Sequence, residues 1–144
     1  MEKNYDALKL ENQLCFPLYA ASRDVIKQYK PMLDKLDLTY TQYIVMMVLW
    51  ERQQITTKEM GKMLHLDSGT LTPLLKKMET KGLVHRKRSE FDERNLTVTI
   101  TNKGMQLREE AVDIPAQMVK CNALDAEESA ILYKLLYKIM DAAQ

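Results

Sequence analysis

The stretch 55–100 changes its hydrophobic period at Gly82, and this change constrains the fold more than any other feature of the sequence. Before Gly82, apolar residues recur at i, i+3, i+4 and i+7, which is the spacing of one helix face. After Gly82, the segments 83–88 and 95–101 read as two short strands, the second with alternating apolar residues. The charged segment 88–95 between them is typical of a hairpin loop. The pattern therefore predicts a helix, a short turn, a second helix and a two-stranded hairpin.

The two helices before Gly82 have recognisable ends. We expect Thr56 or Thr57 to cap the first helix and Ser68 to cap the second, because a hydroxyl oxygen can accept a hydrogen bond from a free N–H group of the first turn. Residues 65–67 would form the turn between them, and Gly82 is a typical helix stop. The apolar residues expected to face inward are Met60, Met63, Leu64, Leu71, Leu74, Leu75 and Met78.

Helices should also dominate the N-terminal part, because only four glycines and four prolines occur in the 144 residues. Helical spacing predicts a first helix over about 7–29, kinked or broken near Pro17. Pro31 would close this segment, and a short helical turn would follow it. The next helix is expected over 43–50, with Thr41 as its N-cap.

Two further helices are predicted after the hairpin. The first spans about 102–121, begins at an N-cap at Thr101 or Asn102 and is bent by Pro115. The second begins at Asp125 and carries an apolar stripe that is too wide for the surface of a small monomer, which favours a dimer. The residues of this stripe are Ile131, Leu132, Leu135, Leu136, Ile139 and Met140.

The charge of the chain is segregated, although its net value is only +1. Residues 76–94 carry seven Lys and Arg against four Asp and Glu, whereas residues 105–144 carry four against seven. Either the second helix or the hairpin, taken alone, reads as an ordinary surface element. Their adjacency and shared positive charge favour a winged helix-turn-helix that faces a polyanion. We therefore predict a mainly α-helical fold with a small β-hairpin wing, of the α+β class.

The chemistry of DNA binding assigns roles to this surface. Small residues at the start of the 68–80 helix let its backbone approach base edges in the major groove. Lys76 and Lys77 can reach phosphates, and Arg94 at the hairpin tip can enter a narrow minor groove. The residues expected at the DNA are Ser68, Gly69, Thr70, Thr72, Pro73, Lys76, Lys77, Arg86, Arg88, Asp92 and Arg94.

These residues resemble a known family. The segment LDSGTLTPLLKKMETKGLVHRKRSEFDERNLTVTIT is similar to the recognition helix and wing of the MarR family of bacterial regulators, with Asp92 and Arg94 in the D-x-R positions of the wing signature. The N-terminal segment LKLENQLCFPLYAASRDVIKQYKPMLDKLDLTYTQYIVMMVLWE resembles the organic-hydroperoxide-sensing branch, the OhrR-type repressors. The resemblance extends over nearly the whole chain.

The resemblance implies a single MarR-type domain over 1–144 that forms a homodimer. Segments 1–36 and 102–144 would form the dimerisation region, and 41–101 would form the winged helix-turn-helix. The dimer would bind a pseudopalindromic operator in double-stranded DNA. Arg94 would lie in the minor groove, and Asp92 would pair with it to hold the wing arginine.

The resemblance also assigns a redox role to Cys15. Hydroxyl groups of Tyr29 and Tyr40, from the partner subunit, would donate hydrogen bonds to its thiolate, with Tyr19 as a weaker candidate. An organic hydroperoxide would oxidise Cys15 to a sulfenic acid, which can condense with a second thiol. That thiol would be Cys121, in a disulfide between subunits; if Cys121 is a spectator, a low-molecular-weight thiol would form a mixed disulfide.

Other functions remain open at this point. A MarR-type regulator could instead respond to a small phenolic or lipophilic ligand, with both cysteines only structural. A thiol enzyme is disfavoured because His65 and His85 both belong to the DNA-binding part, and a metal sensor because the cysteines and histidines show no paired spacing. A non-specific architectural DNA binder would show no operator preference. We expect no cofactor, no metal, no membrane partner and a cytoplasmic location, since the sequence shows neither a signal peptide nor an apolar run long enough to span a bilayer.

Overall fold

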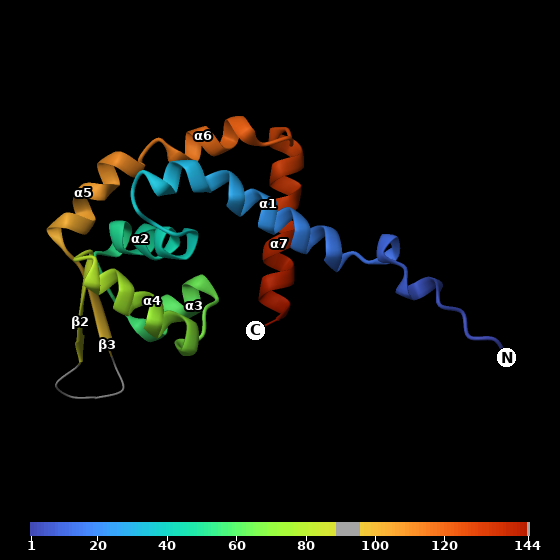
Figure 1. The fold of residues 1–144 in the computed structure, drawn as a ribbon, viewed down its shortest axis with the longest axis horizontal. Coiled ribbons are helices and arrows are strands. Elements are labelled where there is room, and N and C mark those ends of the chain that lie inside the picture. The colour runs from blue at the N-terminus through green and yellow to red at the C-terminus, as the bar shows by residue number, and fades with distance from the viewer. Residues whose placement is uncertain (89–95, 144) are drawn as a thin grey trace. The chain divides into compact units, whose positions relative to one another are not determined.

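The computed structural model describes residues 1–88 and 96–143 and divides into two compact units, 1–112 and 113–144 (Figure 1). The first unit contains two short 3₁₀ turns, five helices and a small sheet, and the second contains two helices. The helices are α1 (Cys15–Asp34), α2 (Tyr40–Arg52), α3 (Thr57–Leu64), α4 (Ser68–Thr80), α5 (Asn102–Ala111), α6 (Ile114–Cys121) and α7 (Ala126–Ala142). The strands are β1 (Gln54–Thr56), β2 (Val84–Arg88) and β3 (Leu96–Ile100).

The wing is an antiparallel sheet in the order β1-β3-β2, and Figure 1 shows β2 and β3 side by side. The two predicted strands are confirmed, with Val84 opposite Ile100 and Arg88 opposite Leu96. The third strand, β1, is a finding that the sequence did not predict. It is only three residues long, and its central Ile55 is buried opposite Val98. A strand of that length shows no readable alternation, so its pairing comes from the tertiary structure.

The core of the first unit is built around α2, which contacts α1, α3, α4, α5, β1 and β3. The side chains of Met46 and Leu49 are fully buried in it. The predicted inner face of α4 is confirmed, because Leu71, Leu75 and Met78 are buried. Each fully buried side chain of this size contributes about 1.5–3 kcal/mol of transfer free energy. The sheet closes the core with Val84 and Val98.

The N-terminal helix differs from the prediction. It begins at Cys15 rather than near residue 7, and two 3₁₀ turns over Asp6–Leu8 and Leu10–Asn12 precede it. Pro17 lies in its first turn, where backbone N–H groups have no helical partner, so no kink is needed. The expected end at Pro31 is wrong. The helix continues to Asp34 because its last turn buries Leu33.

The N-caps of α2 and α4 differ from those predicted by two residues and one residue. Thr39, not Thr41, caps α2 in a capping box with Gln42. Thr56 caps α3 as expected, whereas Asp67 rather than Ser68 caps α4, since its Oδ1 accepts the Thr70 N–H at 2.8 Å. A carboxylate at the positive end of a helix is favourable. The predicted inner position of Met63 is also wrong, because this side chain is exposed and Met60 alone of α3 is fully buried.

The predicted helix over 102–121 is two helices. The proline ring of Pro115 would clash with the carbonyl group of Ala111, four residues earlier, and α5 ends at that residue. Pro115 then lies at the start of α6, where its missing N–H is tolerated. Thr101 caps α5 and Asp125 caps α7 through a capping box, as predicted. Within the described residues, no helix combines the length and the apolar character needed to cross a bilayer.

Candidate functional site

The outer face of α4 is open to solvent, as the sequence predicts. The core-facing side chains Leu71, Leu75 and Met78 turn inward, which leaves the small and basic residues outside. The exposed residues of this face are Ser68, Gly69, Thr70, Thr72, Pro73, Lys76 and Lys77. Hydrogen bonds from the backbone N–H and the side chain of Thr70 hold the pKa of Asp67 below its usual value, so the helix start is fixed by an ionised cap. The first turn of α4 therefore presents small side chains and an exposed backbone, and a helix of this kind can enter a DNA groove.

A groove of about 960 Å³ runs between α3, α4 and the sheet. We call it the cationic groove, because basic side chains of three elements line it and no Asp or Glu does so among the described residues. Its basic residues are Lys58, Lys62, Lys76, Arg86 and Arg88. A groove that concentrates positive charge in this way attracts a polyanion.

Lys58 and Lys62 were missed by the sequence reasoning. They lie four residues apart on α3 and therefore on one face of that helix. That spacing was the available signal, since both residues precede the turn into α4. Their position in the cationic groove extends the basic surface from α4 to α3.

Arg86 lines the cationic groove and is also held by Glu79. Its backbone N–H donates to Glu79 Oε2 at 2.9 Å, and its guanidinium donates to Oε1 at 3.1 Å. These bonds, first the one from the backbone, lower the pKa of Glu79 below its usual value. The Nε of Arg86 is buried and has no hydrogen-bond partner among the described residues. Arg88 is exposed at the end of β2, while Asp92 and Arg94 lie outside the described residues.

Cys15 is the first residue of α1 and is exposed. The neighbouring side chains of Leu14 and Phe16 are exposed as well, at 81% and 44%. Apolar side chains with this much exposure indicate a surface that a second molecule covers. The thiol is therefore accessible in the single chain and lies on a surface suited to association.

Three tyrosines form a cluster at the junction of α1 and α2, which we call the tyrosine cluster. The ring centroids of Tyr29 and Tyr40 are 5.0 Å apart, and those of Tyr29 and Tyr43 are 5.8 Å apart. Burial raises the pKa of all three hydroxyl groups, so they remain protonated donors at neutral pH. Tyr43 was not among the predicted site residues, although its spacing of three residues from Tyr40 on a helix was a usable signal.

The structure does not bring Tyr29 and Tyr40 to the thiol of their own chain. Tyr29 follows Cys15 by fourteen residues of one continuous helix, which is about 21 Å along its axis. Tyr19 is only one turn from Cys15, but its hydroxyl accepts from Arg23 at 3.5 Å and its ring lies under that guanidinium. Any hydrogen bond from the tyrosine cluster to a Cys15 thiolate must therefore come from a second copy of the chain.

The other predicted redox residue is in the second unit. Cys121 is the last residue of α6, is exposed and is not in a disulfide. Within residues 1–88 and 96–143, no group of three or more His, Cys, Asp or Glu side chains could hold a metal ion.

The open face of α4, the cationic groove and the wing define a class: a winged-helix DNA-binding protein. Residues 27–111 match the family model described as transcriptional regulator SarA/Rot. The chain is 51% identical over 141 residues to the organic hydroperoxide resistance transcriptional regulator of Bacillus subtilis, covering 98% of this chain and 96% of that protein. It is 42% identical over 127 residues to the regulator SarZ of Staphylococcus aureus strain USA300, covering 88% and 86%.

Solved structures agree with these relatives. The structure of reduced AbfR bound to DNA matches with a TM-score of 0.79 and 33% identity, covering 96% of both chains. The structure of disulfide-formed AbfR matches with a TM-score of 0.64 and 34% identity, covering 96% of this chain and 94% of that one. The chain therefore belongs to the MarR-type winged-helix transcriptional regulators, in the group that contains SarA/Rot and the organic hydroperoxide resistance regulator.

Proposed function

We propose that this chain is a DNA-binding repressor that binds a pseudopalindromic operator as a homodimer and is released when an organic hydroperoxide oxidises Cys15. The observation that carries this proposal is the 51% identity to the hydroperoxide resistance regulator over 98% of the chain. Two features of the structure support it. The cationic groove beside α4 is suited to DNA, and Cys15 is an accessible thiol.

In the DNA complex, the N-terminal turn of α4 lies in the major groove, where Ser68, Gly69 and Thr70 approach base edges. Lys76 and Lys77 bind phosphates and fix the register, and Thr72 and Pro73 lie on the same exposed face. The wing makes the further contacts. Arg88 binds the DNA phosphate backbone, and Arg94 enters the minor groove, where Asp92 pairs with it. Arg86 acts by fixing β2 to α4 through Glu79.

The sensing reaction starts from the Cys15 thiolate, because the thiolate and not the thiol is the nucleophile. Its sulfur attacks the terminal oxygen of ROOH, the O–O bond breaks, and the alkoxide leaves and takes a proton to give ROH. Cys15 becomes a sulfenic acid. Tyr29 and Tyr40 of the second subunit donate hydrogen bonds to the thiolate. Donors from the second subunit are needed because about 21 Å separates Cys15 from Tyr29 of the same chain along one helix. Tyr19, one turn away on the same helix, is a secondary donor.

The sulfenic acid is then resolved by a thiol. The Cys121 thiolate attacks the Cys15 sulfur, the S–O bond breaks and a disulfide forms between the subunits. The hydroxide that leaves takes a proton from solvent and becomes water. The two AbfR structures support a shape change on disulfide formation, since the disulfide form matches this chain with a TM-score of 0.64 and the reduced DNA-bound form with 0.79. A low-molecular-weight thiol can take the place of Cys121 in the same reaction. The protein acts as a regulator that consumes one equivalent of peroxide, not as an enzyme.

The test is DNA binding under oxidation. Anisotropy with a duplex from the chain's own upstream region, titrated with tert-butyl hydroperoxide, compares wild type, Cys15→Ser and Cys121→Ser. Release of wild type but not of Cys15→Ser supports the proposal. Release of Cys121→Ser only when a small thiol is added shows which thiol resolves Cys15. Retention of all three on DNA overturns the redox switch and favours regulation by a small phenolic or lipophilic ligand.

A further inference from the structure

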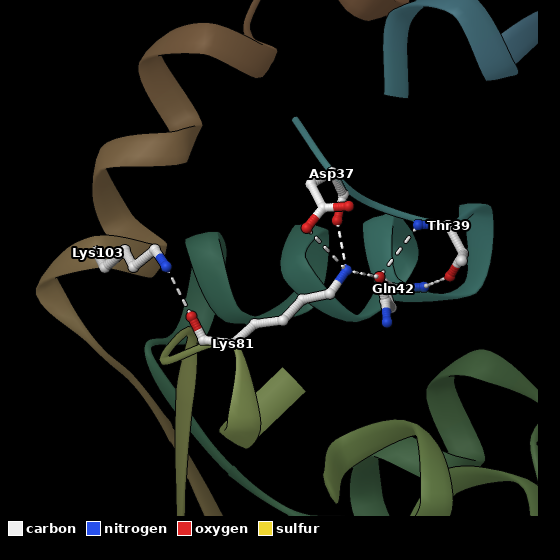
Figure 2. A network of polar contacts seen from close by, with 5 residues as sticks. All are labelled: Asp37, Thr39, Gln42, Lys81 and Lys103. Carbon is white, nitrogen blue, oxygen red and sulfur yellow. Dashed lines mark hydrogen bonds and ion pairs between the residues drawn. The ribbon is translucent and has the colours of Figure 1, made fainter. Parts of the chain in front are cut away.

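Lys81 joins three segments that are far apart in the sequence (Figure 2). It is the C-cap residue of α4, and its ammonium donates to the carbonyl oxygen of Asp37 at 2.5 Å and to Oε1 of Gln42 at 3.1 Å. The Asp37 carboxylate lies 3.6 Å from the same nitrogen. Lys103, in the first turn of α5, donates to the main-chain oxygen of Lys81 at 2.7 Å. The Lys81 ammonium therefore makes two hydrogen bonds to neutral oxygen atoms and one ion pair to a carboxylate.

The oxygen atoms that accept hydrogen bonds from Lys81 are themselves held in place. Gln42 is only 3% exposed, and its Oε1 also accepts the Thr39 N–H at 3.1 Å, which completes the capping box of α2 (Figure 2). Asp37 has a φ of 54°, in the left-handed region that few non-glycine residues adopt, and this conformation orients its carbonyl group toward Lys81. The Asp37 carboxylate is 92% exposed, so solvent screens its ion pair and the two neutral oxygens dominate the contact.

The segment that holds these oxygens also carries the tyrosine cluster. Thr39 is followed directly by Tyr40, and Gln42 lies between Tyr40 and Tyr43 in the first turn of α2. Tyr40 contacts Tyr29 of α1 at a centroid distance of 5.0 Å, across the 35–39 linker. A movement of Tyr40 therefore also moves the backbone of Asp37 and Gln42, which carry the hydrogen-bond acceptors of Lys81.

We propose that Lys81 is a positioning residue that transmits a displacement of the tyrosine cluster to helix α4. The inference rests on the proposed function, because it assumes that oxidation of Cys15 displaces Tyr29 and Tyr40. The linker then shifts, the ammonium of Lys81 follows its two oxygen acceptors, and the C-terminal end of α4 turns with it. The positions of Lys76 and Lys77 relative to phosphates change as a result.

The variants that test this are Lys81→Met, which keeps the aliphatic stem and removes the ammonium, and Lys81→Arg, which keeps a charged donor. Lys35→Met is the matched control, because Lys35 is an exposed cation of the same linker whose side chain makes no hydrogen bond or ion pair within the described residues. Each variant is titrated onto the upstream duplex in its reduced form and after treatment with tert-butyl hydroperoxide. The quantity compared is the ratio of the oxidised to the reduced Kd, with thiol titration to show that Cys15 is oxidised to the same extent.

The expected result is that Lys81→Met lowers this ratio at least tenfold relative to wild type, that Lys81→Arg restores a large part of it, and that Lys35→Met leaves it unchanged. A purely structural role would weaken both Kd values together and leave their ratio within about twofold, and that outcome overturns the inference. Failure of wild type itself to leave the DNA on oxidation is a different result. It would contradict the proposed function, and therefore also the inference that rests on it.

Hydrogen exchange on wild type tests the same step without a substitution, should Lys81→Met not fold. The amide N–H groups of Lys81, Gly82 and Leu83 close the end of α4 by donating to the carbonyl groups of residues 77, 79 and 78. We expect these three amides to exchange at least several-fold faster after oxidation, with the buried amide of Val48 in the middle of α2 unchanged. Equal protection of the three amides before and after oxidation contradicts a movement at this end of the helix.

Discussion

Gly104 lies where α5 meets the sheet, and there is no room for a methyl group at this position. A Cβ atom would lie 2.6 Å from the Leu83 carbonyl oxygen, 2.7 Å from Cγ1 of Ile100 and 3.2 Å from Cε of Met46. The Gly104 carbonyl group also accepts the indole N–H of Trp50 at 2.9 Å, so a shift of the backbone would strain that bond. The residue is small because two backbones approach each other here.

We therefore expect Gly104→Ala to lower the free energy of unfolding by about 1–3 kcal/mol, as overpacking of a tight core does. Urea denaturation followed by circular dichroism measures it. Gly69→Ala is the matched control, because its Cβ would meet only Asp67 Oδ1, at 3.5 Å, and alanine is the better helix former. Equal unfolding midpoints for the two variants would contradict the close approach at Gly104.

The tyrosine cluster gives a prediction about alkaline pH. Burial first, and then Tyr29, raises the pKa of Tyr40 above the ordinary value of 10.0. The folded state therefore holds its phenol protons more tightly than the unfolded state does. This contribution to stability is fully present below the unfolded pKa and is lost as the pH rises through the folded pKa.

A spectrophotometric titration of wild type should show a late phenolate fraction, because burial raises the pKa of Tyr29, Tyr40 and Tyr43 above 10.0. Tyr40→Phe should remove part of this fraction and shift the remainder downward, because Tyr40 also raises the pKa of Tyr43. Tyr5→Phe, at an exposed tyrosine outside the cluster, is the control and should leave the late fraction unchanged. A single transition for all seven tyrosines of the folded protein argues against the cluster.

At the scale of the elements, the contact between Glu79 and Arg86 fixes the last turn of α4 to β2. The lowered pKa of Glu79 means that its stabilising effect is present above the ordinary value of 4.5 and is lost as the pH falls through the lower, folded-state pKa. Glu79→Gln should be less stable than wild type near neutral pH, and the difference should shrink on acidification. Urea midpoints measured between about pH 7 and pH 3 test this. Glu110→Gln, at an exposed carboxyl of α5, serves as the control, and a difference that stays constant over the range refutes the linkage.

The cationic groove predicts how DNA affinity depends on salt. Lys76 is an exposed residue of α4 that lines the groove, and a contact to one phosphate releases about one counterion. Lys76→Ala should weaken binding to operator and random duplex alike and reduce the slope of log K against log salt by about 0.9. Lys35→Ala, which removes an exposed charge away from the groove, should leave the slope unchanged. A loss confined to the operator would instead place Lys76 at a base edge.

The sequence predicted those elements whose signals are local. Helical spacing in α4, the stop at Gly82 and the alternation in β3 are each contained in a few neighbouring residues, and the structure confirms them. It did not predict β1, because three residues have no period, or the continuation of α1 past Pro31, which depends on burial of Leu33. The exact N-caps were also beyond it, since Asp67 and Ser68 are both good caps.

The site divides in the same way. The exposed face of α4 follows from its helical period. Lys58, Lys62 and Tyr43 also show helical spacing, but tertiary packing brings them to the site. Arg86 lines the cationic groove, and its guanidinium also donates to Glu79, a contact that the sequence did not predict. The networks around Lys81 could not be predicted, because the acceptors on Asp37 and Gln42 are about forty residues away along the chain.

At the scale of the whole molecule, the apolar surface that the single chain leaves exposed is the strongest argument for a dimer. Helix α7 exposes Ile131, Leu135 and Ile139 to about half of their full area, at 54%, 49% and 52%. The start of α1 exposes a second apolar surface around Leu14. Both surfaces belong to the segments predicted to form the dimerisation region. An operator with two half-sites then gains affinity because the second winged helix binds intramolecularly.

The decisive test is a charge placed in the α7 surface. Leu135→Asp should convert a dimer of about twice 16.8 kDa into a monomer of that mass in sedimentation equilibrium, since a buried carboxylate without a partner is costly. Affinity for the full operator should fall by about 10²–10⁴, the gain that linking two sites provides, while affinity for a half-site duplex should remain that of wild type. Lys134→Asp, the neighbouring exposed position, is the matched control for the added charge. The half-site affinity should not change because it depends only on α4 and the wing. A Leu135→Asp protein that remains dimeric and binds the full operator as tightly as wild type would show that association depends on another surface.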